Sequence, residues 1–198
     1  MKKDTNKEIR YFGEIRAIED STESRKVEGY AVIFNSQSED LGFYETIESS
    51  AITDEVIAKS DVFALMNHDN SRGILARSKR GKGSLKLLVD DRGLKYEFTA
   101  PKTALGNELL EMLKRGDINQ SSFAFTVSND GEKWEKRDGK YYRTITKIDR
   151  LFDVSPVYQP AYESTSVACR SFNDILKIEK DNLIDYWNNL DAEIDSIK

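Results

Sequence analysis

The sequence predicts one mixed domain, built mainly of antiparallel β-strands with a few helices, and a separate C-terminal helix. Short segments that alternate apolar and polar residues recur between residues 9 and 157, separated by turn sequences, which is typical of antiparallel strands. Helical spacing is clear only in residues 103–116 and after residue 170. The 198 residues suffice for one domain. We therefore expect a domain over residues 1–170 and an amphipathic helix over residues 171–198.

The predicted strands are short and mostly joined by polar connections. In chain order they are residues 9–18, 27–34, 43–47, 61–66, 74–77, 84–89, 93–99, 121–128, 134–136, 140–149 and 151–157. Polar residues 20–25 predict a hairpin connection, residues 70–73 predict a loop, and Asp138-Gly139 lies in a hairpin turn. Residues 90–93 predict a turn, because Asp initiates turns and Gly supplies a positive φ. The segments between residues 74 and 99 predict an antiparallel meander.

Two helices are expected within this domain. Ser49 or Ser50 is a candidate N-cap for a short helix through residues 52–57, since a hydroxyl can accept a hydrogen bond from the first helical turn. Thr103 is the candidate cap of a second helix, which Gly116 ends. The apolar residues of this second helix recur on one face, and they are Leu105, Leu109, Met112 and Leu113.

The C-terminal segment has a different pattern from the rest. Its apolar residues recur at heptad spacing, and they are Leu176, Leu183, Trp187, Leu190, Ile194 and Ile197. A stripe of this kind needs a partner surface. Packing on the domain and association with another chain both remain open, and the stripe leads us to expect a homo-oligomer.

Charge and composition exclude several classes of function. The net charge is −5, and 30 basic residues are interspersed with 35 acidic ones, whereas a nucleic-acid-binding surface needs a concentrated basic face. No segment approaches the ~18 to 20 apolar residues of a membrane span. The first residues also lack the apolar region of a signal peptide. We therefore expect no nucleic acid partner, no membrane and a cytosolic location.

The chain contains one cysteine and one histidine, which limits metal and thiol chemistry. An internal disulfide framework and an ordinary Cys/His zinc site are both excluded by these counts. Cys169 has no base near it in the sequence, which argues against a role as nucleophile. We expect neither a metal nor a cofactor.

The one histidine, His68, follows an apolar segment and is flanked by Asn67 and Asp69. Histidine can accept and return a proton near neutral pH, because its unperturbed pKa is about 6.5. His68 is therefore a candidate general base. A histidine at a strand end is more often a hydrogen-bonded structural residue.

Two later segments supply possible partners for His68. Ser122 lies on a predicted strand directly after a tight turn, on the face opposite Phe123 and Phe125, and a serine nucleophile needs such a rigid position. Asp153 lies in an otherwise apolar strand and could orient the imidazole. A solvent-facing serine and a surface carboxylate are the simpler interpretations. Other acids are also available, and spacing does not choose among Asp69, Asp90, Asp91 and Glu97.

The order of three motifs adds information that no single one carries. Asn-His-Asp at residues 67–69, Ser-Phe-Ala-Phe at residues 122–125 and Asp-Val-Ser-Pro-Val at residues 153–157 occur in sequence. With Gly-Tyr-Ala-Val-Ile-Phe-Asn at residues 29–35 and Tyr-Glu-Thr-Ile at residues 44–47, this pattern resembles the HK97-type prohead proteases of tailed phages. The resemblance covers residues 8–170.

The resemblance implies a serine endopeptidase that cleaves scaffold segments and the major capsid protein inside the assembling procapsid, in the host cytoplasm. It also implies an antiparallel β-barrel with a few surrounding helices, similar to the herpesvirus assembly protease. Ser122 is then the nucleophile, His68 the general base and Asp153 the third member, at a position that is often Glu in the family. Ala124 stands where Gly is common in the family.

Two other functions remain open. The chain could be a catalytically silent capsid-assembly or scaffold protein on the same fold, or a β-barrel hydrolase of other specificity. The distance between the side chains of Ser122 and His68 distinguishes the silent protein from the protease, because proton transfer needs hydrogen-bonding distance.

Overall fold

The structure is a computed structural model that describes residues 6–18, 24–158 and 166–196. By their internal contacts the residues form two compact units, Met1–Glu163 and Ser164–Lys198, which are described separately. The predicted hairpin connection lies mostly in residues 19–23, outside the described residues.

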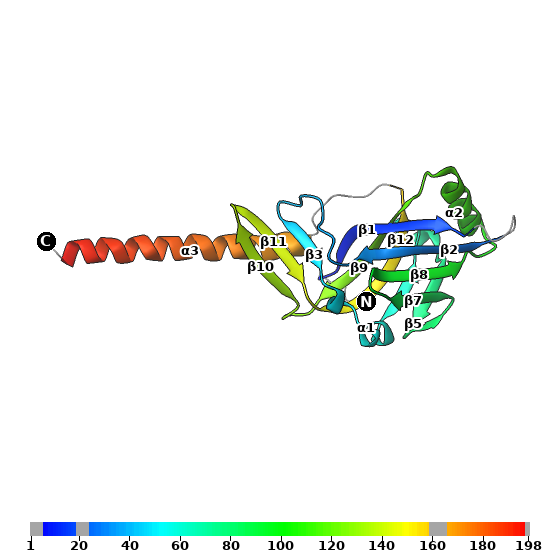
Figure 1. Ribbon diagram of the computed structural model, residues 1–198, viewed down its shortest axis with the longest axis horizontal. Coiled ribbons are helices and arrows are strands. Elements are labelled where there is room, and N and C mark those ends of the chain that lie inside the picture. Colours follow the sequence, from blue (N-terminus) through cyan, green and yellow to red (C-terminus); the bar gives the residue numbers. More distant parts are fainter. Residues whose placement is uncertain (1–5, 19–23, 159–165, 197–198) are drawn as a thin grey trace. The chain divides into compact units, whose positions relative to one another are not determined.

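The first unit consists mostly of strands (Figure 1). Its strands are β1 (Glu8–Ala17), β2 (Lys26–Ile33), β3 (Tyr44–Ile47), β4 (Asp61–Ala64), β5 (Ala76–Lys79), β6 (Lys82–Gly83), β7 (Leu85–Val89), β8 (Gly93–Thr99), β9 (Gln120–Val127), β10 (Glu132–Arg137), β11 (Lys140–Ile145) and β12 (Ile148–Val157). Its described helices are α1 (Asp54–Lys59) and α2 (Ala104–Arg115), with short 3₁₀ turns at Ser49–Ala51 and Asn70–Arg72.

Nine strands form one sheet in the order β6-β5-β4-β12-β9-β1-β2-β8-β7. Its two outer strands, β6 and β7, follow each other in the chain, and the Ser84 hydroxyl between them accepts a hydrogen bond from the Arg77 N–H on β5. The sheet therefore curls into a nearly closed barrel. Strands β10, β11 and β3 form a second, smaller sheet (Figure 1). The predicted mainly β, barrel-like fold class with a few helices is confirmed.

Two pairs of strands are parallel, although the sequence predicted antiparallel pairing throughout. These pairs are β4 with β12 and β3 with β11. The predicted meander over residues 74–99 is only partly correct, because β5 pairs with β4 and β6 whereas β7 pairs with β8. The two parallel pairs join strands that lie far apart in the chain, and local sequence patterns do not set such pairings.

The predicted cap of the first helix was wrong. Ser49 and Ser50 lie in a 3₁₀ turn, and the cap of α1 is Thr53, whose side chain accepts a hydrogen bond from the Val56 N–H. The second helix agrees with its prediction at both ends. Thr103 caps α2 through the Gly106 N–H, and Gly116 ends it with a left-handed φ of 78°. Leu109 on α2 is fully buried in the barrel core.

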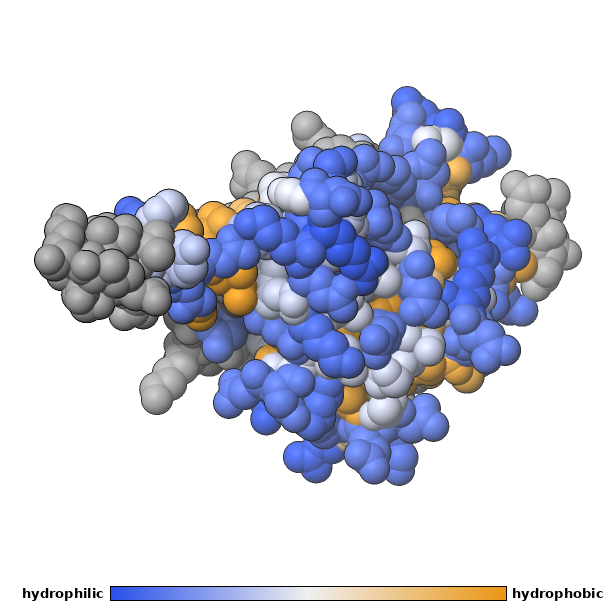
Figure 2. Space-filling view, turned by 60° about the vertical axis from the view of Figure 1, so that its left-hand side comes forward, coloured by the Kyte–Doolittle hydropathy of each residue, from blue (hydrophilic) through white to orange (hydrophobic). Residues whose placement is uncertain are grey.

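The barrel core is apolar and continuous. Alternating positions of β2 point inward, and β9 is buried on both of its faces. Phe123 and Phe125 of β9 stack in this core with ring centroids 4.5 Å apart. The face of the molecule in Figure 2 is mostly hydrophilic, with hydrophobic residues in scattered patches. Strand β9 is therefore central in the sheet and tightly packed.

The second unit contains helix α3 (Ser166–Ser196). Three residues of the predicted apolar stripe, Leu176, Leu183 and Trp187, are exposed. The side chains of Leu190 and Ile194, the residue Ile197 and the side chain of Cys169 lie outside the described part of the chain. Within the described residues, no helix combines the length and the hydrophobicity that crossing a membrane requires.

Candidate active site

Strands β9 and β12 place Ser122 and Asp153 on one face of the sheet. The antiparallel register sets Ser155 opposite Ser122, and Asp153 opposite Ala124. Side chains two residues apart on a strand point to the same face, so Asp153 and Ser155 both lie on the face of Ser122.

His68 reaches the same face from the end of β4. After that strand the backbone continues along β12, since Leu65 N–H donates to Val154 O and Asn67 N–H donates to Pro156 O, at 3.2 and 2.9 Å. Asn67 and His68 then adopt left-handed φ values of 54° and 61°. Such values are uncommon for residues other than Gly and cost about 1 to 3 kcal/mol each, and they are frequent at functional sites.

The three predicted site residues are in direct contact. His68 Nε2 lies 2.6 Å from Ser122 Oγ, and His68 Nδ1 lies 2.5 Å from Asp153 Oδ1. A neutral imidazole has one donor and one acceptor nitrogen, and a carboxylate only accepts. Nδ1 therefore carries the proton donated to Asp153, and Nε2 is left to accept the proton of Ser122.

Asp153 is held in its charged form although it is only 1% exposed. Burial disfavours the charge, but the hydrogen bond from His68 and the positive charge that this ring carries when protonated outweigh this effect, together with the charge and hydrogen bond of Lys7, and keep the pKa of Asp153 below its ordinary value. Lys7 Nζ donates to Asp153 Oδ2 at 2.9 Å. The carboxylate is thus anchored through both oxygens.

The other candidate acids are engaged elsewhere. Asp69 accepts hydrogen bonds from the backbone and hydroxyl of Ser71. Asp90 accepts from Tyr30 and closes the turn before β8, which also contains Asp91. Glu97 pairs with Lys86 on the neighbouring strand. The carboxylate in contact with His68 is therefore the one that the third motif contributes.

Both simpler interpretations of the site residues are wrong. Ser122 is 0% exposed instead of facing solvent, and Asp153 is 1% exposed on a central strand instead of lying at the surface. His68 is the most accessible of the three, with 11% of its side chain exposed.

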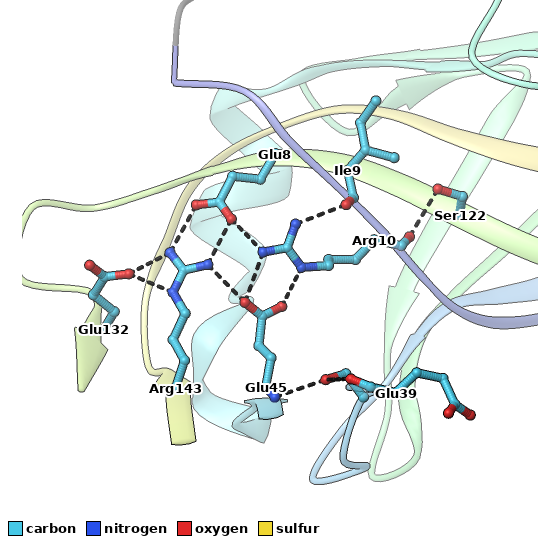
Figure 3. A network of polar contacts seen from close by, with 9 residues as sticks. Glu8, Ile9, Arg10, Glu39, Glu45, Ser122, Glu132 and Arg143 are labelled. Carbon is cyan, nitrogen blue, oxygen red and sulfur yellow. Dashed lines mark hydrogen bonds and ion pairs between the residues drawn. The ribbon is translucent and has the colours of Figure 1, made fainter. Parts of the chain in front are cut away.

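The Ser122 hydroxyl has a second acceptor besides His68. It donates to the main-chain oxygen of Arg10 on β1 at 2.9 Å, as Figure 3 shows. A hydroxyl has one proton, so Arg10 O and His68 Nε2 compete for it. Strand β1 pairs with β9 on the side opposite β12, with Tyr11 in register with Ser122. Ser122 is therefore enclosed by a strand on either side.

A buried ionic network fixes this part of β1 (Figure 3). Arg10 donates to both oxygens of Glu45 on β3 and to Glu8. Arg143 on β11 donates to Glu8, Glu45 and Glu132. Arg10, Glu8, Glu45 and Arg143 are each at most 4% exposed. The network therefore joins the second sheet to the strand that covers Ser122.

Sequence reasoning missed three residues that contact the site. Ser155 donates to Asp153 Oδ1, Lys7 binds the other oxygen of that carboxylate, and Arg10 O accepts from Ser122. Only Ser155 had a local signal, because it follows Asp153 by two positions on the same strand. Among the described residues, no cluster of His, Cys, Asp or Glu could hold a metal ion.

A hydroxyl, an imidazole and a carboxylate in hydrogen-bonded sequence form the arrangement used by serine hydrolases. The family model of the caudovirus prohead serine protease matches residues 13–178, which include His68, Ser122 and Asp153. The chain belongs to this family of serine peptidases. Searches of curated proteins and of solved structures gave no match.

Proposed function

We propose that the protein is a serine endopeptidase in which Ser122 is the nucleophile, His68 the general base and Asp153 the residue that orients His68. The observation that carries this proposal is the continuous contact from Ser122 Oγ through both ring nitrogens of His68 to Asp153. The 2.6 Å separation of Ser122 and His68 is hydrogen-bonding distance, which favours the protease over a silent assembly protein.

The contacts support an acyl-transfer mechanism. Ser122 Oγ attacks the substrate carbonyl carbon as its proton passes to His68 Nε2, and the imidazolium keeps its Nδ1 proton directed at Asp153. His68 then gives the Nε2 proton to the leaving amine, and the peptide C–N bond breaks. A water molecule, deprotonated by His68, hydrolyses the acyl-enzyme and releases Ser122.

Substrate access requires a conformational change near Ser122. A peptide often binds by adding a strand to an exposed sheet edge. Strand β9 has no such edge at Ser122, because β1 and β12 pair with it on both sides. Binding of a peptide as an added strand at Ser122 therefore needs β1 to move, or the added strand lies elsewhere on the barrel.

The complete burial of Ser122 is the one observation that favours a catalytically silent assembly protein. Labelling with a fluorophosphonate probe separates the two functions. The protease is expected to become labelled at Ser122 and to lose labelling in Ser122→Ala. A folded protein that excludes the probe at all times supports the silent alternative.

The catalytic roles are tested by co-expression with the major capsid protein of the same phage. Ser122→Ala should remain folded and leave the capsid protein intact, whereas the neighbouring Ser121→Ala should retain cleavage. Ser121 is equally buried but contacts Tyr96 and the Glu14 main chain on the other face of the sheet. Cleavage by Ser122→Ala would exclude Ser122 as the nucleophile.

The substrates follow from the family and not from the site itself. A prohead serine protease has capsid proteins available as substrates, so we infer cleavage of scaffold segments and the major capsid protein inside the procapsid, in the host cytoplasm. Mass measurement of the co-expressed products tests this inference and locates the cleaved bonds. An intact scaffold with a cleaved capsid protein would restrict the substrates to the latter.

We also infer that residues 1–170 form the protease domain and that residues 171–198 promote a homo-oligomer. The exposed heptad residues of α3 support this inference. Removal of residues 171–198 should lower the mass of the assembly measured by light scattering. An unchanged mass would show that the helix is not the oligomerisation element.

A further inference from the structure

Ser155 on β12 contacts both members of the His68–Asp153 pair. It is fully buried and lies in register with Ser122. Its hydroxyl donates to Asp153 Oδ1 at 2.8 Å, and its oxygen lies 3.2 Å from His68 Nδ1. The mechanism described above assigns no step to this hydroxyl.

The protons of these groups can be assigned by counting donors. Asp153 only accepts, so the Ser155 proton points to Oδ1. The Ser155 oxygen then offers only lone pairs to His68 Nδ1, which must carry a proton for this contact to be favourable. Asp153 Oδ1 lies 2.5 Å from His68 Nδ1 and also accepts only, so this contact likewise requires a proton on Nδ1. Ser155 and Asp153 together favour one tautomer, with the proton on Nδ1.

That tautomer has a direct consequence at the other side of the ring. With the proton on Nδ1, Nε2 is unprotonated and faces Ser122 Oγ at 2.6 Å. The opposite tautomer would direct an N–H at Ser122 and place the lone pair of Nδ1 against the carboxylate. Only the first tautomer can accept the serine proton.

Ser155 also fixes the orientation of the carboxylate. Lys7 binds Oδ2, but its side chain is 35% exposed, so this contact is open to water. Ser155 is fully buried and binds Oδ1 from a position two residues along the same strand. A fixed carboxylate holds the imidazole in the plane needed for proton transfer, and small misplacements of catalytic groups cost large factors in rate.

We propose that Ser155 is a positioning residue that sets the tautomer of His68 and the orientation of Asp153. The consequence for catalysis rests on the proposed function. The tautomer itself does not, so the two can be tested separately.

The first measurement uses the fact that His68 is the only histidine in the chain. Every ring signal of the full-length protein labelled with ¹⁵N-histidine therefore belongs to this residue. At about pH 8 we expect a protonated Nδ1 and an unprotonated Nε2, and Ser155→Ala should shift both signals toward a mixture of tautomers. Ser155→Thr retains the hydroxyl and should retain the native signals. Native signals in Ser155→Ala would overturn the proposal.

The second measurement is the rate at which a fluorophosphonate labels Ser122. Ser155→Ala should lower this rate by about tenfold to a hundredfold, and Ser155→Thr should restore most of it. Ser121→Ala removes an equally buried hydroxyl that does not contact the site, and it should leave the rate within about twofold. An equal decrease of the labelling rate in Ser121→Ala would show that Ser155 has only a structural role.

The two measurements fail in different ways. If the native protein is never labelled, the proposed function is wrong, and the ring signals still decide whether Ser155 sets the tautomer. If Ser155→Ala does not fold, Ser155→Cys retains a similar volume with only a weak donor and carries the same two expectations.

Discussion

Replacing Glu45 by Gln removes one charge from the buried ionic network and leaves the shape of the side chain almost unchanged. Glu45 is 0% exposed and accepts three hydrogen bonds, from Arg10 Nε at 2.6 Å, Arg10 Nη2 at 2.9 Å and Arg143 Nη1 at 2.7 Å. The amide of Gln can accept at only one of the two positions. Its NH₂ group would point at a guanidinium, so the variant leaves buried positive charge without a full partner.

The expected loss of stability is large. Breaking a buried ion pair by removing one partner costs about 3 to 5 kcal/mol. In a protein of this size each 1 kcal/mol lowers Tm by about 2 to 4 °C, so Glu45→Gln should lower Tm by roughly 6 to 20 °C. The pKa of Arg143 also indicates that the network is strongly attractive. Burial lowers this pKa, but the surrounding carboxylates outweigh burial and raise the pKa above the ordinary arginine value.

Urea unfolding followed by circular dichroism measures this loss, and a matched exposed pair provides the control. Glu97 pairs with Lys86 at 2.8 Å, and the two side chains are 42% and 75% exposed. Glu97→Gln should change the free energy of unfolding by less than about 1 kcal/mol. If the free energy of unfolding of Glu45→Gln is also within about 1 kcal/mol of that of the native protein, the buried network does not stabilise the fold.

Two further predictions concern acid and close backbone packing. Burial disfavours the charged carboxyls of Glu45 and Asp153, but hydrogen bonds and positive charges of their neighbours hold both pKa values below the ordinary range. The stability that these two charged carboxylates contribute is complete above the ordinary carboxyl pKa of about 4, and it is lost as the pH falls through their lowered pKa values. The urea concentration at the midpoint of unfolding should therefore decrease when the pH is lowered below about 4. This decrease should be smaller in Glu45→Gln. A Cβ added to Gly93 would lie 2.0 Å from the main-chain oxygen of Val32, whereas at Gly139 nothing lies within 4 Å. Gly93→Ala should therefore destabilise the barrel by more than the about 1 to 2 kcal/mol expected for Gly139→Ala, whose φ is +76°, and equal losses would contradict the close packing of β2 on β8.

The positions of the site residues on their elements could be predicted from the sequence, but their contacts could not. Strand alternation was enough to separate Ser122 from Phe123 and Phe125. The motif resemblance named Asp153, but the physical reason to prefer it over the other acids is the parallel pairing of β4 with β12, which brings His68 alongside that carboxylate. Residues 64 and 154 lie far apart in the chain, and no local pattern sets the register between them.

The sequence patterns did not predict the ionic network, for a related reason. Glu8, Arg10, Glu45 and Arg143 lie in charged or alternating strands, where such residues are usually solvated. They are buried because the second sheet covers the start of β1, and that sheet depends on the parallel pairing of β3 with β11. A hydrophobic pattern predicts which apolar residues are buried, but it does not predict the burial of charged residues that form ion pairs with one another.

The same network connects stability with access to Ser122. Glu45 and Arg143 hold Arg10 and Glu8 in place, and the main-chain oxygen of Arg10 competes with His68 for the Ser122 proton. Any peptide that reaches Ser122 through this side must displace that carbonyl, and each 1.4 kcal/mol needed to do so lowers the open population about tenfold. Interactions that strengthen this part of the fold therefore reduce the reactivity of the serine. Stability and activity are expected to oppose each other at β1, which is the usual consequence of a rigid element that covers an active site.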